Sequence, residues 1–320
     1  MKLIFLSDKY VGSNLAKPVY NKNGNIVLNK GGNLSDFAIK KLNSLGIYSA
    51  YVEEEGTEDI VVEDVIDVNT QLKCIMLLEE AFHSIQKNGY FDESQITDLL
   101  KEILQNLSIS ENTLSVSNGV RNIENSIYVH SLNVAILSAI IGINLNYNYE
   151  KIYNLVLGAF LHDVGYALCD NEQHTTKGIE ILRNNTKINV TSYITALQHH
   201  ERVDGLGYPN QQNGNDIYEF SKIVAICNEY DNLISKKGLQ PFEAFEEIMG
   251  KSSTYFDENI INVFKKSIYI YPTGMEVKLN NGDIGVVCQQ NKYMPMRPIV
   301  KTKNKHYNLL EELTLFIDNN

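Results

Sequence analysis

The spacing of apolar residues divides the chain into three parts. In the first part, up to about residue 68, short apolar runs alternate with turn signals. Asn23-Gly24 predicts a β-hairpin between residues 18–20 and 26–28. Ser35 is a suitable N-cap for a following helix, Gly46 ends that helix, and residues 47–52 have strand character. This pattern predicts a small α/β module.

The middle part has helical periodicity from about residue 69 to 266. Amphipathic stretches cover 70–88, 93–107, 112–145 and 150–162. After Tyr271 the period changes to alternation, with Asn281-Gly282 as a second hairpin signal. The predicted fold is therefore mainly α: a helical domain over 69–270, flanked by an α/β module over 1–68 and a β-rich module over 271–320.

Composition and charge narrow the class of protein. The chain has 320 residues, of which 43% are hydrophobic and 21% charged, which indicates a folded protein of two or three domains. A net charge of -11 argues against a chain that coats long nucleic acid or anionic lipid. The acidic run 53–67 is expected to be a solvated connection or an edge strand.

The cysteines and the apolar runs indicate in which cellular compartment the protein is expected. The four cysteines are far apart and form no CxxC pair, so neither a disulfide framework nor a thiolate zinc site is indicated. We expect no membrane span, because we find no run of about 18 apolar residues, and no signal peptide, because the apolar N-terminal run is short. These features favour the cytoplasm.

The histidines are unevenly distributed. Of seven, five fall between positions 130 and 200: His130, His162, His174, His199 and His200. Imidazole is the commonest ligand for transition metals and a frequent proton carrier, so the crowding indicates a site, with chance clustering as the alternative. His83 and His306 stand apart and are expected at the surface or in packing.

His162 and Asp163 follow the apolar stretch 155–161, where a helix is expected to end in a turn at Gly165. Adjacent His and Asp side chains at a helix end can ligate one cation, and the carboxylate can bridge to a second. These two residues are the candidates for the catalytic role.

Two segments carry a resemblance to a known family. Residues 199–209 read HHERVDGLGYP and residues 161–165 read LHDVG. Together they resemble the HD-GYP family of bacterial cyclic di-GMP phosphodiesterases. Residues 130–134 and 174–182 are similar to further segments of that family, and the resemblance covers about 112–268.

The resemblance implies an all-helical HD-superfamily core that holds two or three divalent transition metals. For this chain we expect two, of iron, manganese or zinc. It implies hydrolysis of cyclic di-GMP to pGpG or GMP. By position, the first metal would be held by His130, His162, Asp163 and, more weakly, Asn228. The second metal would be held by Asp163, His174 and His199, with His200 on this or an additional metal.

The chain departs from the family pattern at the metal ligands. Asn228 stands where the family has an aspartate, and a neutral amide is a poorer ligand than a carboxylate. Ser126 stands where some members have a glutamate for a third metal, which favours at most two metals. Asp231, three residues after Asn228, is expected to be structural.

Other departures concern the substrate. Tyr166 replaces a lysine that resembles a phosphate contact, and only 10 residues separate Asp163 from His174, so the pocket wall is expected to differ. Lys236 and Lys237 replace an arginine-containing segment and remain candidates for phosphate contact.

The glycine-rich end of the HHERVDGLGYP segment is expected to shape the rim of the site. Its candidate substrate-binding residues are Asp204, Gly205, Gly207, Tyr208 and Pro209. Glu201 and Asp204 are expected either to support this loop or to assist proton transfer.

Two functions from different classes remain open at this point. One is a metal-dependent phosphodiesterase acting on cyclic di-GMP or a related cyclic dinucleotide, attenuated by the substitutions. The other is a degenerate HD-GYP module that binds a nucleotide or a protein partner without turnover. Homodimerisation is left open in both.

Overall fold

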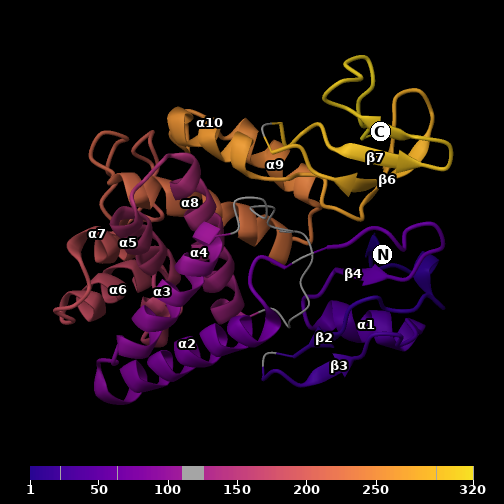
Figure 1. Ribbon diagram of the computed structural model, residues 1–320. Coiled ribbons are helices and arrows are strands. Elements are labelled where there is room, and N and C mark those ends of the chain that lie inside the picture. The colour runs from indigo at the N-terminus through magenta and orange to yellow at the C-terminus, as the bar shows by residue number, and fades with distance from the viewer. Residues whose placement is uncertain (22, 63, 110–125, 293, 320) are drawn as a thin grey trace.

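The computed structural model describes residues 1–319 except 22, 63, 110–125 and 293 (Figure 1). Most of the described helices belong to one domain, which lies beside the two flanking modules (Figure 1). The helices of that domain are α2 (Val68–Asn88), α3 (Ser94–Ile109), α4 (Ile127–Asn144), α5 (Tyr149–Phe160), α6 (His174–Arg183), α7 (Val190–Gln198), α8 (Glu219–Ser235), α9 (Pro241–Gly250) and α10 (Glu258–Ser267), with a short 3-10 helix η2 (Val164–Ala167) after α5. The predicted mainly helical fold is confirmed. The predicted helical stretches correspond to α2, α3, α4 and α5, except that residues 112–125 of the third stretch lie outside the described residues.

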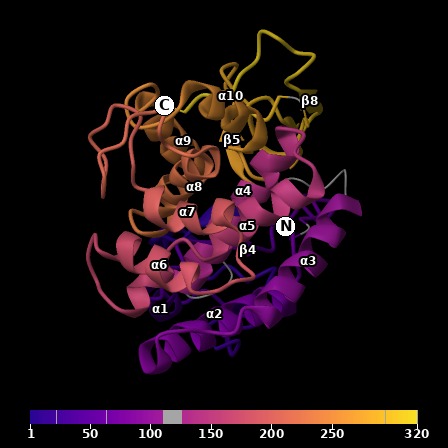
Figure 2. The same cartoon turned by 90° about the vertical axis from the view of Figure 1, so that its left-hand side faces the viewer.

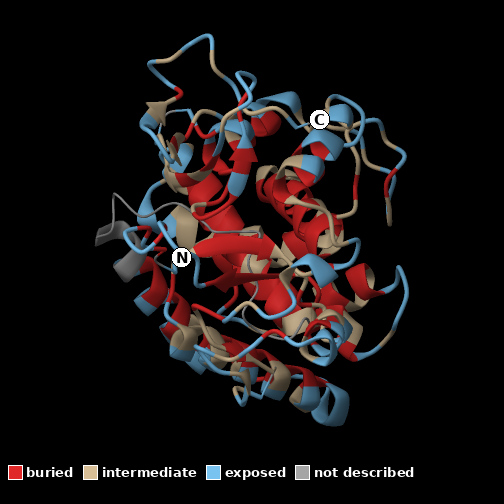
Figure 3. Cartoon of the chain, turned by 90° about the vertical axis from the view of Figure 1, so that its right-hand side faces the viewer, coloured by how far each residue is buried: buried red, intermediate tan, exposed pale blue. Residues whose placement is uncertain are grey.

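α4 forms the centre of the helical domain and packs against α5 and α8, with α2 and α10 also in contact (Figure 2). It is buried almost all round, which explains why its sequence is apolar on every face. Among the described residues, α4 is long and apolar enough to span a membrane, with a mean hydropathy of 1.6 over 18 residues. Our expectation that no such run exists is wrong for α4, although 67% of this helix is buried inside the protein. The buried residues gather in the middle of the molecule and the exposed ones lie at its periphery (Figure 3).

Side-chain caps fix the starts of several helices that carry the site. Ser126 Oγ accepts a hydrogen bond from Val129 N at 3.3 Å and begins α4. Asn148 and Asn189 cap α5 and α7 in the same way. A polar oxygen at this position satisfies one of the free N–H groups of the first turn. Ser126 therefore has a local structural role in the place where some HD-GYP proteins carry a glutamate.

The N-terminal module contains two antiparallel strand pairs and one helix. β1 (Lys2–Phe5) pairs with β4 (Ser49–Val52), and β2 (Val19–Tyr20) pairs with β3 (Ile26–Leu28) across the predicted hairpin. α1 (Asp36–Ser44) begins at Ser35, whose hydroxyl accepts from Ala38 N at 3.1 Å. The predicted hairpin and helix of this module are confirmed. A one-turn 3-10 helix, η1 (Asp8–Tyr10), follows β1.

The C-terminal module is a four-stranded antiparallel sheet in the order β5-β6-β7-β8. β5 (Glu276–Lys278) and β6 (Ile284–Gln289) form the hairpin predicted at Asn281-Gly282. The strands β7 (Ile299–Thr302) and β8 (His306–Asn308) were not predicted from the sequence, because apolar and polar positions alternate more weakly in them.

The two flanking modules contact each other, although they lie at opposite ends of the chain (Figure 1). Leu3 N donates to Gly274 O at 2.8 Å, and Lys2 Nζ lies 2.6 Å from a carboxylate oxygen of Glu276. The acidic run between β4 and α2 contains no strand among its described residues, and it buries Ile60 and Ile66 while Glu53 to Glu55 are exposed. It is a connection and not an edge strand.

Candidate metal centre

Asp163 lies in the short segment between α5 and η2, next to the start of α6. α5 ends at Phe160, Leu161 is its C-cap, and His162 and Asp163 follow directly before η2. Gly165 then passes so close to α6 that a Cβ at this position would lie 1.9 Å from the carbonyl oxygen of His174. Only glycine allows η2 to approach the start of α6 in this way. This close approach brings His174 next to Asp163.

The two oxygens of Asp163 face two different pairs of histidines. Oδ2 lies 3.3 Å from His162 Nε2 and 3.7 Å from His130 Nε2. Oδ1 lies 3.6 Å from His174 Nε2 and 3.4 Å from His199 Nε2. His200 joins the second set, so the described residues form two buried groups that share Asp163: His130, His162 and Asp163, and Asp163, His174, His199 and His200. The structure thus brings together every predicted histidine ligand.

Backbone carbonyls fix the orientation of three of these imidazoles. The Nδ1 atoms lie 2.7 Å from Ala159 O in His162, 2.8 Å from Asn171 O in His174 and 3.1 Å from Thr195 O in His199. A carbonyl can only accept, so each Nδ1 carries the proton and each Nε2 keeps its lone pair. The lone pairs are therefore directed by α5, α6 and α7 toward the Asp163 carboxylate.

The donor set fits bound divalent cations. His162 Nε2 and Asp163 Oδ1 are buried, and neither has a hydrogen-bond partner among the described residues. Buried polar atoms of this kind are rare unless a ligand or ion satisfies them. Imidazole nitrogens combined with a carboxylate are the ligand types of zinc, iron and manganese sites. The two groups are consistent with a dinuclear metal site bridged by Asp163.

Burial and mutual charge set the protonation of the ligands. Burial lowers the pKa of His174 to about 4, and His199 adds to this effect. Burial also lowers the pKa of His199 and His200. Burial alone would raise the pKa of Asp163, but His162 and His199 outweigh it and hold that pKa well below its ordinary value. At neutral pH the carboxylate is therefore ionised and these imidazoles are neutral, which are the forms that bind metal.

Asn228 and Asp231 both reach His130 from α8. Asp231 Oδ2 lies 2.6 Å from His130 Nδ1, and Asn133 Nδ2 donates to Asp231 Oδ1 at 3.1 Å. Asn228 Oδ1 lies 2.9 Å from His130 Nε2 and accepts from Asn232 Nδ2 at the same distance. The structure therefore places Asn228 at the first group, as expected for its sequence position. Asp231 orients a ligand histidine, a role that the spacing of residues on α8 alone did not reveal.

Two tyrosines stack on histidines of the second group. The ring of Tyr166 lies 4.0 Å from that of His174, at an angle of 8°. The ring of Tyr208 lies 4.6 Å from that of His200, at 19°. Burial raises the pKa of both phenols, that of Tyr166 to about 12, so both are neutral hydrogen-bond donors. Tyr166 and Tyr208 thus cover the second group with neutral rings.

The loop after His200 is fixed by its acidic side chains. The buried Glu201 carboxylate accepts from Asn210 N at 2.7 Å and from Gln212 N at 3.0 Å. Asp204 accepts from Leu206 N at 3.0 Å and pairs with Arg202. Both acids therefore support the loop, and these contacts favour support over the alternative of proton transfer.

Two glycines of this loop are required by its backbone geometry. Gly205 has φ of +75°, and a Cβ on Gly207 would lie 2.5 Å from Glu201 Cα. The first is a backbone conformation that suits glycine, and the second is a close approach that only glycine permits. The peptide bond between Tyr208 and Pro209 is cis. Gly207 and Tyr208 line the same hollow as His199 and His200, whereas Gly205 and Pro209 are not among its lining residues.

That hollow has a volume of about 260 Å³ and lies beside the second group. It is lined by His199, His200, Glu201, Arg202, Leu206, Gly207, Tyr208, Ala225, Asn228, Glu229, Tyr255 and Phe256. Lys236 and Lys237 are not among these residues. They are exposed and follow the last turn of α8, with Lys236 about 12 Å along the helix from Asn228 at 1.5 Å per residue. Their contact with a phosphate remains a prediction.

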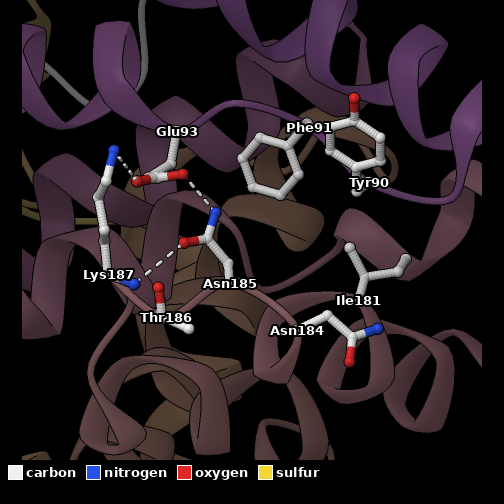
Figure 4. A pocket seen from close by; sticks show the side chains of 8 residues that line it. All are labelled: Tyr90, Phe91, Glu93, Ile181, Asn184, Asn185, Thr186 and Lys187. Carbon is white, nitrogen blue, oxygen red and sulfur yellow. Dashed lines mark hydrogen bonds and ion pairs between the residues drawn. The ribbon is translucent and has the colours of Figure 1, made fainter.

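A second hollow, of about 270 Å³, lies between the start of α3 and the end of α6 (Figure 4). Its buried charged group is Glu93, which is 4% exposed, and Lys187 also lines it. The Glu93 carboxylate accepts from Asn185 Nδ2 and lies 3.2 Å from Lys187 Nζ (Figure 4). Tyr90 and Phe91 are also on its wall. No pattern in the sequence indicated this hollow.

The helical domain is similar to known proteins in both sequence and fold. Residues 168–260 match the HD domain family. The chain is 27% identical over 241 residues to the cyclic di-GMP phosphodiesterase PA4108 of Pseudomonas aeruginosa, covering 69% of this chain and 58% of that protein. It is 26% identical over 192 residues to the cyclic di-GMP phosphodiesterase PdeB of Borreliella burgdorferi, covering 54% and 51%. The matches thus span between a half and three fifths of these relatives.

Among solved structures, Bd1817, an HD-GYP-type protein of Bdellovibrio bacteriovorus, has the same fold with a TM-score of 0.52 and 18% identity. The match covers 82% of this chain and 97% of that one. The protein therefore contains an HD domain. The two sequence relatives named above are HD-GYP cyclic di-GMP phosphodiesterases, in agreement with the resemblance of residues 161–165 and 199–209.

Proposed function

We propose that this protein is a metal-dependent phosphodiesterase that hydrolyses cyclic di-GMP to pGpG or GMP. The observation that carries the proposal is the Asp163 carboxylate between two sets of histidine Nε2 atoms, 3.3–3.7 Å away. The relatives named above are phosphodiesterases for the same dinucleotide. A cytoplasmic location, where cysteines stay reduced, is part of the proposal.

Two divalent cations, iron, manganese or zinc, would supply the positive charge that polarises a phosphodiester and acidifies water. His130, His162 and Asp163 would hold the first, and Asp163, His174, His199 and His200 the second. Asp163 belongs to both groups, because each of its two oxygens faces one pair of histidines. The stacked rings of Tyr166 and Tyr208 limit the access of water to the second set, and their hydroxyls are neutral donors for phosphate oxygens.

We expect the first group to bind a cation more weakly than the second, because of a residue of this chain. Asn228 offers a neutral amide, and its oxygen is already 2.9 Å from His130 Nε2. Cation binding there must separate this pair without gaining a negative ligand. We therefore expect slow hydrolysis, limited by occupancy of the first set.

The same observation supports a second candidate, a nucleotide-binding module without turnover. In that case the second set holds a metal and cyclic di-GMP binds without being cleaved. Protein partners or a second copy of the chain would then bind the form of the protein that holds cyclic di-GMP. The two candidates differ in their products and not in their affinity for the ligand.

The test uses full-length protein reconstituted with Mn²⁺ or Fe²⁺ without oxygen. Metal content is measured by elemental analysis, and cyclic di-GMP, pGpG and GMP are separated by chromatography. We expect bound metal, and products that Asp163→Asn abolishes together with the metal. Bound metal and bound cyclic di-GMP without product would select the second candidate. Protein that stays folded and takes up no metal would refute both.

A further inference from the structure

The hollow beside His199 and His200 contains side chains that the metal centre does not use. The Arg202 guanidinium lies over the ring of Tyr255, 3.5 Å from its centroid. Glu229 comes from α8, one residue after Asn228, and lines the same hollow. Neither Glu229 nor Tyr255 belongs to the HD or GYP segments that carry the family resemblance.

The Arg202–Tyr255 pair is held by backbone hydrogen bonds. Val203 N donates to Tyr255 O at 3.3 Å, and Asp204 N donates to Thr254 O at 3.0 Å. Tyr255 is 39% exposed, so part of the pair is available to a ligand. Flat guanidinium and aromatic groups are the surfaces on which proteins stack nucleobases. The pair therefore provides a preformed stacking surface next to the metal ligands.

A carboxylate stands beside this surface. Lys251 Nζ lies 2.6 Å from Glu229 Oε1 and fixes the orientation of the side chain, which remains 33% exposed. The structure assigns no partner to Glu229 Oε2 among the described residues. Carboxylate oxygens accept from paired N–H groups, and guanine presents two of these, N1–H and N2–H, along one edge. Adenine presents a ring nitrogen lone pair at the corresponding place, which a carboxylate repels.

Arg202 adds a donor of its own. Its Nε is buried and has no hydrogen-bond partner in the part of the chain that the structure describes, while its Nη2 pairs with Asp204. The volume of about 260 Å³ accommodates one purine base with part of its ribose. The exposed Leu206 lies at the apolar rim.

We infer that this hollow is a guanine subsite, in which Arg202 and Tyr255 stack the base and Glu229 reads its N1–H and N2–H groups. The inference rests on the proposed function, because it takes a cyclic dinucleotide as the ligand of the adjoining metal centre. It assigns the preference for guanine over adenine to Glu229. With the base in this hollow, the adjoining phosphodiester lies toward His199 and His200.

The test measures equilibrium binding of cyclic di-GMP and of cyclic di-AMP to full-length, Mn²⁺-loaded protein by calorimetry. We expect tighter binding of cyclic di-GMP, and we expect Glu229→Gln to reduce that preference by about tenfold or more, because one charged acceptor for the guanine edge is lost. Tyr255→Leu should weaken both ligands by at least about fivefold, while Tyr255→Phe retains the ring and should not. Glu247→Gln, at an exposed position on α9 outside the hollow, is the matched control.

The outcomes separate this inference from the proposed function. If wild-type protein hydrolyses cyclic di-GMP, but Glu229→Gln and Tyr255→Leu leave both affinities unchanged at full metal content, the subsite is refuted and the phosphodiesterase stands. Equal affinity of the wild type for the two dinucleotides also refutes it. If Glu229→Gln removes a guanine preference in a protein that yields no product, the subsite stands and the proposed hydrolysis fails.

Discussion

Asp231 Oδ2 and His130 Nδ1 lie 2.6 Å apart and form a buried pair between α8 and α4. The carboxylate fixes the ring of His130 and leaves Nε2 as the atom that can face the Asp163 carboxylate. Carboxylates that hold the second nitrogen of a ligand histidine raise its basicity and orient it. Asp231 is therefore a positioning residue for the first group of ligands.

Asp231→Asn is expected to lower metal affinity at the first group by about 10- to 100-fold, because the amide no longer fixes the charge and orientation of His130. The second group should keep its metal. Titration with Mn²⁺ monitored by electron paramagnetic resonance measures both sites. Glu219→Gln, at the start of α8, is the control for a change of charge on this helix, and equal loss at both sites would contradict a role through His130.

Asn228→Asp is expected to raise metal affinity at the first group and the rate of cyclic di-GMP hydrolysis, each by about tenfold or more, since it supplies the missing negative ligand. Metal stoichiometry and single-turnover rates measure the two effects. Asn228→Ala removes the amide without adding charge, so it should not increase turnover. A folded Asn228→Asp protein with unchanged metal content and rate would show that residue 228 has no part in the site.

Gly165→Ala is expected to destabilise the protein by at least about 3 kcal/mol, because its Cβ would meet the His174 carbonyl oxygen at 1.9 Å and neither backbone can yield without moving a ligand. Urea unfolding monitored by circular dichroism measures the loss. The matched control is Gly250→Ala at the end of α9, where no atom lies within 4 Å of an added Cβ. That control should change stability by less than about 1 kcal/mol. Equal stability of the two variants would contradict the close approach of η2 and α6.

The acid stability of the protein should depend on Glu93. Burial alone would raise its pKa, but Asn185 and Lys187 outweigh this effect and hold the pKa of the folded state below the ordinary 4.5. A lowered carboxyl pKa contributes stability above the unfolded-state pKa, and this contribution is lost as pH falls through the folded-state pKa. In metal-free protein, the free energy of unfolding should therefore fall less steeply below about pH 4.5 in Glu93→Gln than in wild type. Parallel slopes for the two proteins would contradict the pairing shown in Figure 4.

The sequence by itself determined the helical domain and singled out the histidines and the aspartate of the candidate metal centre. Helical periodicity over 70–88 and 150–162 corresponds to α2 and α5, because an apolar stripe at helical spacing is a local pattern. The histidines were found because their residue types and spacing are unusual. The hairpins at Asn23-Gly24 and Asn281-Gly282 were also local, since two residues specify the turn.

Tertiary packing decided which atoms meet. The contact of Asp231 with His130 depends on how α8 packs against α4, and the guanine subsite depends on the 254–255 turn lying against the 202–204 loop. No periodicity encodes the register between neighbouring helices or between distant loops. β7 and β8 are further cases, because their short, half-buried strands gain their stability from pairing with β6 and with each other. The physical reason is the same in each case: local patterns fix which face of an element is apolar, whereas the partner of each polar atom is set only when separate elements pack.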